Sequence, residues 1–518
     1  MSSFTPHRAA RPDGFSRALR AEWAMFRSLR GLVLTLAASV LVTVSIGLLV
    51  AGSVQISCVT AQGEGPCPAP LLGPDGTAVN DRYFFVHQPL KGDGVITARV
   101  SDLTGEIRLP DAVPGVRNVT KGVVPWAKAG LLVRRSLAQG GSYAAVMLTG
   151  GHGVRMQHDF VHDVAGSPVR GPRWLRLTRS GETVTGYESG DGRTWTEVGT
   201  ARLAGLPETV EIGLFATSPG DVREMAKRYA QAAATFDRIG LQGANGPWRQ
   251  DDVGLVMQPD GTPHHPGRAV ESGDEILVAG GGDIGPATME GGLRADLLLL
   301  GGALGLIPVL LAAVRFGTAA HQAGPTGSGP PDGSGGPGLP VGSRPARVLG
   351  ARAVVVGAVA FVTGLVAAGI VLPAGLAMVR ANQNRVQPLT LGTELRVIVG
   401  YAALTAFAAV LALGLAALTR RSLVAAVPAL ALVVVPYLLA SAGQATWLLT
   451  ITPAAGFAIT QSIPAFAHVD VDRSLLGGYY PLPPWAGLAV TVAYAGLALA
   501  AAIAVRGRSG ATPELRRR

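Results

Sequence analysis

The sequence predicts an all-α membrane domain of six helices, with an all-β sandwich domain inserted on the outer side of the membrane. Three observations predict this fold class. Only 15% of the 518 residues are charged, against about 25% in soluble globular chains. Charges are absent from several runs that are long enough to cross about 30 Å of hydrocarbon as helices. Residues 54–295, between the first two of these runs, are polar and rich in strand and turn signals.

Long apolar runs set the expected membrane spans. They cover residues 31–53, 296–315, 353–379, 397–419, 422–441 and 485–505. The first run is longer than the roughly 7–15 residues of a signal-peptide core, and the long basic segment 1–30 precedes it. We therefore expect a retained first span and not a cleaved leader.

The distribution of arginine predicts the orientation, because short cytoplasmic segments carry an excess of Arg and Lys. Arginines crowd residues 1–30, the segment 316–352, the pair at 420–421 and the tail 506–518. With six spans these segments share one side, which we expect to be the cytoplasm. Both termini are then cytoplasmic in a bacterial plasma membrane, and residues 54–295 are extracytoplasmic. Three arginines lie on the other side, against the rule: Arg380, Arg385 and Arg396.

The net charge of +10 does not indicate a nucleic-acid-binding protein. Such a protein gathers its basic residues on one polar face, whereas here arginines flank apolar runs. Lysine is rare and arginine abundant, which we interpret as the codon usage of a GC-rich bacterial genome. We expect no nucleic-acid partner.

Turn and cysteine positions describe the inserted domain further. Ser180-Gly181 and Asp191-Gly192 are hairpin-turn signals within residues 172–199 and predict a three-stranded meander there. Cys58 and Cys67 are the only cysteines and follow the first span on the expected oxidising side. We expect a disulfide that closes a short loop in the stalk; the alternative is two unpaired thiols.

Three segments of this domain, Trp126–Arg134, Arg173–Gly199 and Ile212–Ser218, resemble the concanavalin-A-like lectin/glucanase fold. The resemblance implies a jelly-roll, lectin-like sandwich, and members of this family often bind sugars on a sheet face. A candidate ligand face for a sugar or another cell-envelope ligand consists of five aromatic residues: Trp126, Tyr143, Trp174, Tyr187 and Trp195. The alternative is that most of these side chains fill the core.

Catalytic and metal sites are not expected. The E-x-D-x-E pattern of the glucanases is missing, and glycoside hydrolysis needs two opposed carboxylates. The run His158–Asp163 contains two histidines and two aspartates, but its context is strand and loop, so we expect an exposed polar loop. We predict a protein without enzymatic activity, cofactor or metal.

An amphipathic helix is predicted before the first span. Phe15, Leu19, Trp23 and Phe26 recur at near-helical spacing, while most arginines, Arg27 and Arg30 among them, occupy other faces. Such a helix lies in the membrane interface, where its arginines reach the lipid head groups. The alternative is a basic flank without a structural role.

Two regions of the membrane part resemble permease subunits of type-2 ABC exporters. The segment Ala21–Ser28 is similar to the opening of these chains, although Met25 stands where the family usually has a lysine. Thr452–Pro464 and Gly478–Val490 are similar to the end of permeases of the actinobacterial type. The resemblance implies six spans, an interfacial elbow helix, and short re-entrant helices between spans five and six. It also implies export, a separate ATPase subunit, and a second permease copy as homodimer or heterodimer.

The residues themselves agree with these expectations. Residues 447–468 are apolar but broken by prolines, which suits re-entry where protein buries the backbone. The candidate residues of this segment are Pro453, Phe457, Gln461 and Pro464. No lysine follows a glycine, so the phosphate-binding loop of an ATPase is missing. The resemblance implies that the elbow helix and the loop after span two contact the ATPase, and the candidate residues are Phe15, Leu19, Trp23, Phe26, Arg27, Arg30 and Arg347.

The Gly/Pro-rich stretch within residues 316–352 predicts a flexible cytoplasmic linker. The functional prediction is a permease subunit that moves a substrate with a partner's ATP cycle. The alternative is a membrane-anchored carbohydrate-binding or sensor protein, which would need only one or two anchor helices. Few charges lie inside the spans, so the sequence indicates no substrate.

Overall fold

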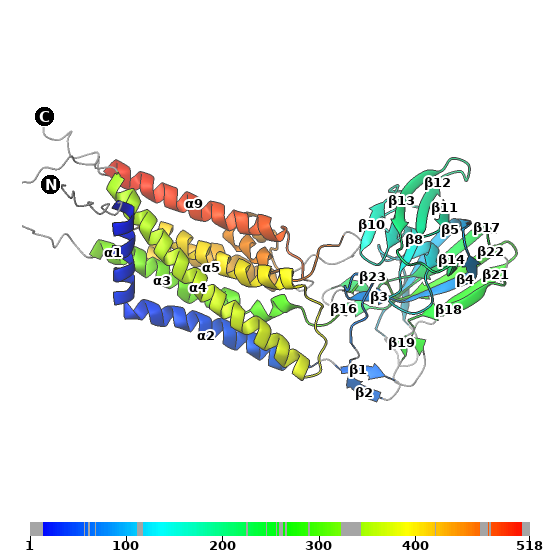
Figure 1. Cartoon of the computed structure of the whole chain (residues 1–518), viewed down its shortest axis with the longest axis horizontal. Coiled ribbons are helices and arrows are strands. Elements are labelled where there is room, and N and C mark those ends of the chain that lie inside the picture. Colours follow the sequence, from blue (N-terminus) through cyan, green and yellow to red (C-terminus); the bar gives the residue numbers. More distant parts are fainter. Residues whose placement is uncertain are drawn as a thin grey trace, which may run out of the picture.

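The computed structural model describes residues 14–509, apart from residues 56, 61–62, 68, 111–117, 224–225, 245, 255, 258–262, 265–266, 288–290, 323–342, 420, 467–474 and 476–477. A helical bundle and a β domain lie end to end along the long axis (Figure 1). Nearly all of the Gly/Pro-rich stretch falls outside the described residues.

The bundle contains six helical segments that are long and apolar enough to cross a membrane. They make this chain a multi-pass membrane protein with a helical membrane part. The elements are α2 (Arg30–Ser53), η2 (Ala295–Leu299) with α3 (Gly302–Gln322), α4 (Ser343–Ala381), α5 (Leu391–Thr419), α6 (Ser422–Val433) with α7 (Val435–Ser441), and α9 (Pro484–Ser509).

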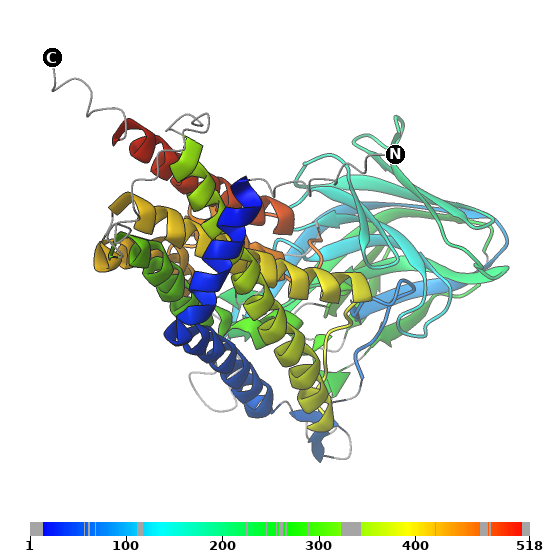
Figure 2. The ribbon, with the colours of Figure 1, turned by 60° about the vertical axis from the view of Figure 1, so that its left-hand side comes forward.

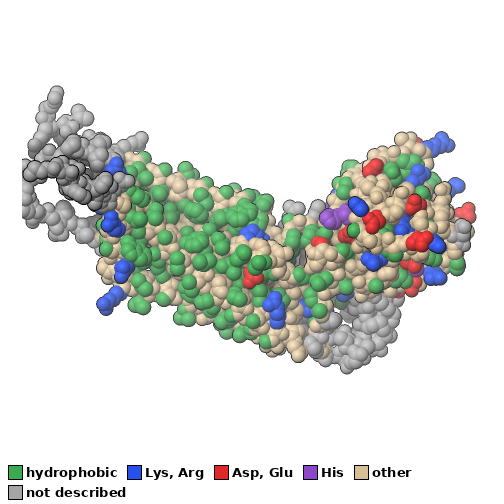
Figure 3. Space-filling view, in the orientation of Figure 1, with side chains coloured by type: hydrophobic (Ala, Val, Ile, Leu, Met, Phe, Trp, Pro, Cys, Tyr) green, Lys and Arg blue, Asp and Glu red, His purple; other side chains and the backbone are tan. Residues whose placement is uncertain are grey.

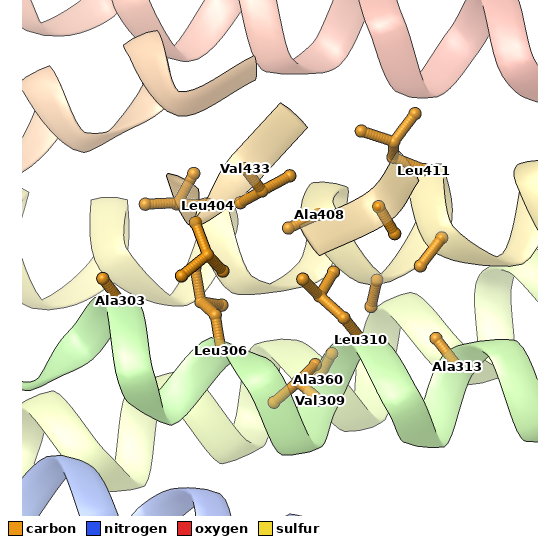
Figure 4. Packing of buried hydrophobic residues seen from close by; sticks show 14 of the residues in the cluster. Ala303, Leu306, Val309, Leu310, Ala313, Ala360, Leu404, Ala408, Leu411 and Val433 are labelled. Atoms are coloured by element: carbon orange, nitrogen blue, oxygen red, sulfur yellow. The ribbon is translucent and has the colours of Figure 1, made fainter. Parts of the chain in front are cut away.

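α5 is the central helix of the bundle. In its most apolar stretch 72% of the residues are buried, against 22% in α2 and 28% in α9. The core that surrounds it is mostly aliphatic, with a few aromatic rings such as Tyr401 and Phe457, and its side chains pack densely. Figure 4 shows Leu306 and Leu310 of α3 beside Leu404 and Leu411 of α5. α2 and α9 lie at the outside of the bundle (Figure 2). The surface of the bundle there carries many apolar side chains (Figure 3).

α4 is longer than the sequence predicts. Its 39 residues give a length of roughly 58 Å at about 1.5 Å per residue, well beyond the hydrocarbon thickness. The expected span began at residue 353, because Arg347 and Arg352 interrupt the apolar run. The helix continues through both arginines, since another helix packs against this extension, as described below.

The β domain is built from two large antiparallel sheets. The seven-stranded sheet has the order β10-β9-β8-β7-β14-β4-β18, and the eight-stranded sheet contains β13-β12-β11-β5-β17-β22-β21 with β6 paired to β5. Their bounds are β4 (Tyr83–Lys91), β5 (Gly94–Arg108), β6 (Val119–Lys121), β7 (Lys128–Arg134), β8 (Tyr143–Thr149), β9 (Val154–His158), β10 (His162–Ala165), β11 (Arg173–Ser180), β12 (Thr183–Ser189), β13 (Thr196–Arg202), β14 (Thr209–Thr217), β17 (Ala230–Gln242), β18 (Arg249–Val253), β21 (Arg268–Ser272) and β22 (Glu275–Gly281).

The inner faces of the two sheets share one hydrophobic core. Val86 and Leu131 of the seven-stranded sheet belong to it together with Ile96 and Leu175 of the eight-stranded sheet. The strands β11, β12 and β13 form the predicted meander, and Gly181 and Gly192 in its turns have positive φ values of 59° and 72°. Buried and half-exposed residues alternate along β11. The face of the eight-stranded sheet that points away from the shared core is therefore partly exposed to solvent at this strand.

The outer face of the seven-stranded sheet is covered by the chain itself. Tyr83, Phe85 and Tyr143 form a second core there with Phe160 and Ile284. Every residue of β7 and β8 is buried as a result. Two charged residues of β7 are paired within this layer: Lys128 Nζ lies 2.8 Å from Asp283 Oδ1, and Arg134 Nη2 lies 3.1 Å from Asp81 Oδ2.

Both connections between the β domain and the bundle are held by one short loop, residues 382–390, between α4 and α5. Asn384 Nδ2 donates to the carbonyl of Val54 at the end of α2 (2.9 Å). The Leu293 amide donates to the Arg385 carbonyl (2.9 Å), and the Gln387 amide donates to the Leu293 carbonyl (3.0 Å). The entry and the exit of the β domain are thus fixed to the same part of the bundle.

A hairpin of β1 (Ser57–Thr60) and β2 (Gly63–Pro66) follows α2. Cys67 is buried and disulfide-bonded, and Cys58 is the only other cysteine of the sequence. The disulfide therefore closes this hairpin at the stalk and lies outside the sandwich core.

Candidate functional site

The bundle has one candidate site at each end, and the first is the helix α1 (Gly14–Ser28). It lies across the end of the bundle that is farther from the β domain, at a steep angle to α2 (Figure 1). Leu29, with φ −90° and ψ 76°, breaks the helix between α1 and α2. The chain therefore turns at Leu29 from the plane of this end into the first span.

A buried ion pair fixes α1 to α4. Arg352 Nε donates to Glu22 Oε2 at 2.8 Å, and the two residues are only 7% and 8% exposed. Phe26 packs edge-on against Phe316 of α3, with 5.4 Å between ring centroids. Sequence reasoning missed Glu22, although it is the only acidic residue of a helix with three arginines, and that contrast was the available signal.

The predicted apolar stripe of α1 divides into two groups. Leu19 and Phe26 face the bundle, Leu19 half-buried against its core and Phe26 buried. Phe15 and Trp23 are exposed, at 42% and 44%. Two side chains on one edge thus remain available to lipid or to a partner.

Basic residues surround this end of the bundle. Arg27 and Arg30 are exposed, as are Arg17 and Arg20, and blue side chains line this end in Figure 3. Arg347 is half-buried, and its guanidinium lies close to Gly14 at the start of α1. All seven residues that the sequence analysis predicted to face an ATPase lie at this end of the bundle.

The second candidate site is the broken segment between α7 and α9. It contains α8 (Leu448–Ile451) and the 3-10 helix η3 (Pro453–Thr460), separated by Thr452 in an extended conformation. All eight residues of η3 are buried. Thr491 of α9 donates to the Pro453 carbonyl (2.7 Å), and the Phe457 ring stacks on Tyr437 of α7 (4.0 Å between centroids). η3 is too short to cross a membrane and is enclosed by the bundle.

Arg396 of α5 satisfies the backbone where η3 ends. Its Nη1 donates to the Ile459 carbonyl (3.1 Å) and its Nη2 to the Gln461 carbonyl (2.6 Å). The Gln461 side chain bonds the Ile463 carbonyl (2.8 Å) and accepts from the Tyr480 amide (3.2 Å). Of the four predicted residues, Pro453 and Phe457 serve packing, Gln461 shapes the backbone, and Pro464 is exposed.

A pocket of about 270 Å³ opens beside these residues. It is lined by Arg396, Gln461, Ile463–Phe466 and Tyr479–Pro484. Arg396 is the only charged residue in this lining. In the sequence, Arg396 is conspicuous only as an exception to the orientation rule. Arg396 comes directly before the apolar run 397–419, and an arginine at the end of a span on the outer side was the available signal.

A buried ion pair joins this region to the exit of the β domain. Arg294 Nη2 lies 3.2 Å from Asp296 Oδ2, and Asp296 accepts a hydrogen bond from the Ser462 hydroxyl. Arg294 also donates to the Leu475 carbonyl (3.0 Å). The segment that follows η3 is thereby tied to the residues that leave the β domain.

The five aromatic residues of the expected ligand face do not lie together. Trp126 and Tyr143 are buried at the seven-stranded sheet, which corrects the idea of a single five-residue platform. Trp126 comes just before β7 and Tyr143 is the first residue of β8, and both strands are buried on both faces. Trp174, Tyr187 and Trp195 are half-exposed and belong to the meander of the eight-stranded sheet. Arg176 lies opposite Tyr187 in the register, and its guanidinium stacks on the Trp195 ring at 3.9 Å.

The run His158–Asp163 forms the hairpin between β9 and β10 and is not an exposed loop throughout. Phe160 has a positive φ of 68° and is fully buried in the second core, because its ring packs edge-on against Tyr143. The rings of His158 and His162 stack at 4.4 Å. Among the residues that the structure describes, no group of three or more His, Cys, Asp or Glu side chains is placed to hold a metal ion.

No protein-family model matches this chain, and no curated protein matches it. Among solved structures, the chain is similar to a functionally unknown protein from Saccharomyces cerevisiae, at 14% identity and a TM-score of 0.21. The similarity covers 38% of this chain and 95% of the yeast protein. The fold itself defines the class: a multi-pass membrane protein with a large antiparallel β domain.

Proposed function

We propose that this chain is the membrane-spanning permease subunit of an ABC transporter, an exporter driven by a separate ATPase subunit. The observation that carries the proposal is the position of α1. This helix lies across one end of the bundle, exposes arginines there, and is fixed to α4 by the Glu22–Arg352 pair. A motor subunit outside the membrane needs a rigid lever of this kind on the transport domain.

The proposed orientation follows from the same end of the molecule. The described chain begins and ends there, and the β domain lies at the opposite end (Figure 1). We place the basic end in the cytoplasm of a bacterial plasma membrane, in accord with the excess of arginines. The broad apolar faces of α2 and α9 would be covered by lipid and by a second permease copy.

In this proposal the β domain is an extracytoplasmic accessory of the jelly-roll, lectin-like type. The half-exposed group of Trp174, Tyr187 and Trp195, with Arg176 stacked on Trp195, supports a role in contacting sugars of the cell envelope. That group also favours the alternative function, a membrane-anchored surface protein whose β domain binds carbohydrate. Six membrane helices and a lever-like α1 exceed what an anchor needs, so we favour the permease.

The test is co-purification with an ATPase subunit encoded beside this chain. In a mild detergent we expect the tagged wild-type chain to retain the ATPase. Replacing Arg27 and Arg30 with glutamate should lower the retained ATPase by roughly tenfold, a loss of about 1.4 kcal/mol. Arg380→Glu, an exposed arginine at the other end of the bundle, is the matched control and should retain it.

Failure of the wild-type chain to retain any such ATPase would refute the permease proposal and favour the anchored surface protein. Equal retention by the double variant and the wild type would refute the assignment of α1 as the docking element.

A further inference from the structure

The pocket beside η3 has a positive charge that no described residue around it balances. Arg396 is half-buried, and no carboxylate among the described residues lies within ion-pair distance of it. The nearby Arg294 and Asp296 neutralise each other. A cation held at the edge of a hydrocarbon region without a counter-charge is costly, so an anion at this place would be stabilised.

Arg396 also has donors to spare. An arginine side chain carries five N–H groups, and the bonds to the Ile459 and Gln461 carbonyls use two of them. These two bonds hold the guanidinium in place, so that little side-chain freedom remains to be lost when a ligand binds. The arginine is therefore a fixed donor at the wall of a pocket.

The position of the pocket points to an amphiphile. Its lining includes Pro484, the first residue of α9, and the next residue, Trp485, is 65% exposed. Trp447, at the start of α8, is 61% exposed. Exposed tryptophans at the ends of spans mark the depth of the lipid head groups. Apolar walls from Ile463 and Phe466 complete a site that is half polar and half apolar.

We propose that this pocket binds the phosphate group of an anionic phospholipid in the membrane leaflet next to the β domain. A volume of about 270 Å³ suits a head group, with the acyl chains left outside in the bilayer. The phosphate accepts hydrogen bonds from Arg396, and the glycerol part lies against the apolar wall. This binding does not depend on the proposed transport function, because it needs no ATPase.

Native mass spectrometry of the purified full-length chain tests the proposal. Phosphatidylglycerol and phosphatidylcholine with the same acyl chains are added at equal concentration. We expect the wild type to bind phosphatidylglycerol preferentially, at one tight site. Arg396→Gln should weaken this site by about tenfold or more, and Arg396→Lys should weaken it less. Arg380→Gln, which removes an exposed charge at the same end, is the matched control.

A second variant guards against a structural effect, because Arg396 also supports the backbone after η3. Ala465 is exposed at the rim of the pocket. Ala465→Trp should fill the pocket and reduce binding while it leaves both carbonyl bonds of Arg396 intact. Equal binding of the two lipids by the wild type would overturn the proposal, as would wild-type affinity in both Arg396→Gln and Ala465→Trp.

Competition by soluble anions distinguishes a phosphate group that belongs to a lipid from a free phosphate ion. We expect inorganic phosphate and glycerol phosphate to compete with phosphatidylglycerol only at concentrations far above that of the lipid. Competition at equal concentration would show that the site takes a free anion, and would overturn the assignment to a lipid.

Discussion

Asp191 organises the turn between β12 and β13. Its Oδ1 accepts hydrogen bonds from the amides of Thr194 and Arg193, both at 2.8 Å, and from the Ser189 hydroxyl at 3.0 Å. These bonds, led by the Thr194 amide, lower the pKa of Asp191 from 3.8 to about 2. Gly192 follows with φ +72°, and a Cβ there would lie 2.7 Å from the Trp174 ring. The turn therefore needs both residues of the Asp-Gly pair.

The charge of Asp191 should stabilise the β domain at every pH above about 4 and lose this effect in stronger acid. Because its folded-state pKa lies below the unfolded value, the stabilisation is present above about pH 4 and is lost as the pH falls toward 2. Asp191→Asn should therefore lower the melting temperature of the full-length chain at pH 7, and the difference from wild type should shrink at pH 3. Tryptophan fluorescence can follow the transition. Asp274→Asn, in the exposed turn before β22, is the matched control. A difference between Asp191→Asn and wild type that is as large at pH 3 as at pH 7 would contradict the assignment.

At the residue scale, sequence patterns predicted Phe26 and Gln461 as site residues, but they did not predict the distant residues that contact these two segments. Phe26 followed from helical spacing, whereas Arg352, the partner of Glu22, lies 330 positions along the chain. Arg396 was likewise separated from Ile459 and Gln461 by more than 60 positions. A single sequence shows the periodicity of a helix. It does not show which charged residue, far away in sequence, the fold places next to a residue of that helix.

At the scale of elements, close contacts between helices depend on glycine. Gly47 of α2 faces η2, and a Cβ at this position would lie 2.4 Å from the Leu298 carbonyl oxygen and 2.2 Å from Val371 Cγ2 of α4. A backbone atom cannot move aside cheaply. The first span can therefore pack closely against the second and third only because residue 47 has no side chain.

Gly47→Ala should destabilise the bundle by roughly 1–3 kcal/mol, the usual cost of an overpacked core. Gly369→Ala in α4 is the matched control, because a Cβ there meets no atom within 4 Å; helix propensity alone should stabilise that variant by up to about 1 kcal/mol. Melting of the detergent-solubilised chain measures both. Equal melting temperatures for the two variants would contradict the close packing at Gly47.

The lengths of the elements were predictable where apolar runs end at charges, and not where packing continues a helix. The expected span 422–441 coincides with α6 and α7, and the expected start of the last span at 485 lies one residue after the start of α9. α4 departs most, because α1 covers its polar extension and pairs with Arg352. The second core of the β domain also had no clear signal, since Phe160 and Ile284 reach it from segments far apart in sequence.

At the scale of the whole molecule, α4 connects the two ends. α1 is fixed to it at Arg352, and the loop that follows its other end holds both stalks of the β domain through Asn384, Arg385 and Gln387. A displacement of α1 would therefore reach the β domain through one continuous helix. In the proposed transporter, this helix is the path by which the ATPase cycle acts on the outer side.

The most direct test of the account is the side of the membrane on which each end lies. Arg17→Cys places a thiol on the exposed face of α1, and Arg193→Cys places one in an exposed turn of the β domain. A membrane-impermeant maleimide should label the Arg193→Cys chain in intact bacterial cells and the Arg17→Cys chain only after permeabilisation. Labelling of Arg17→Cys in intact cells, with Arg193→Cys protected, would contradict the orientation and the docking of an ATPase on α1.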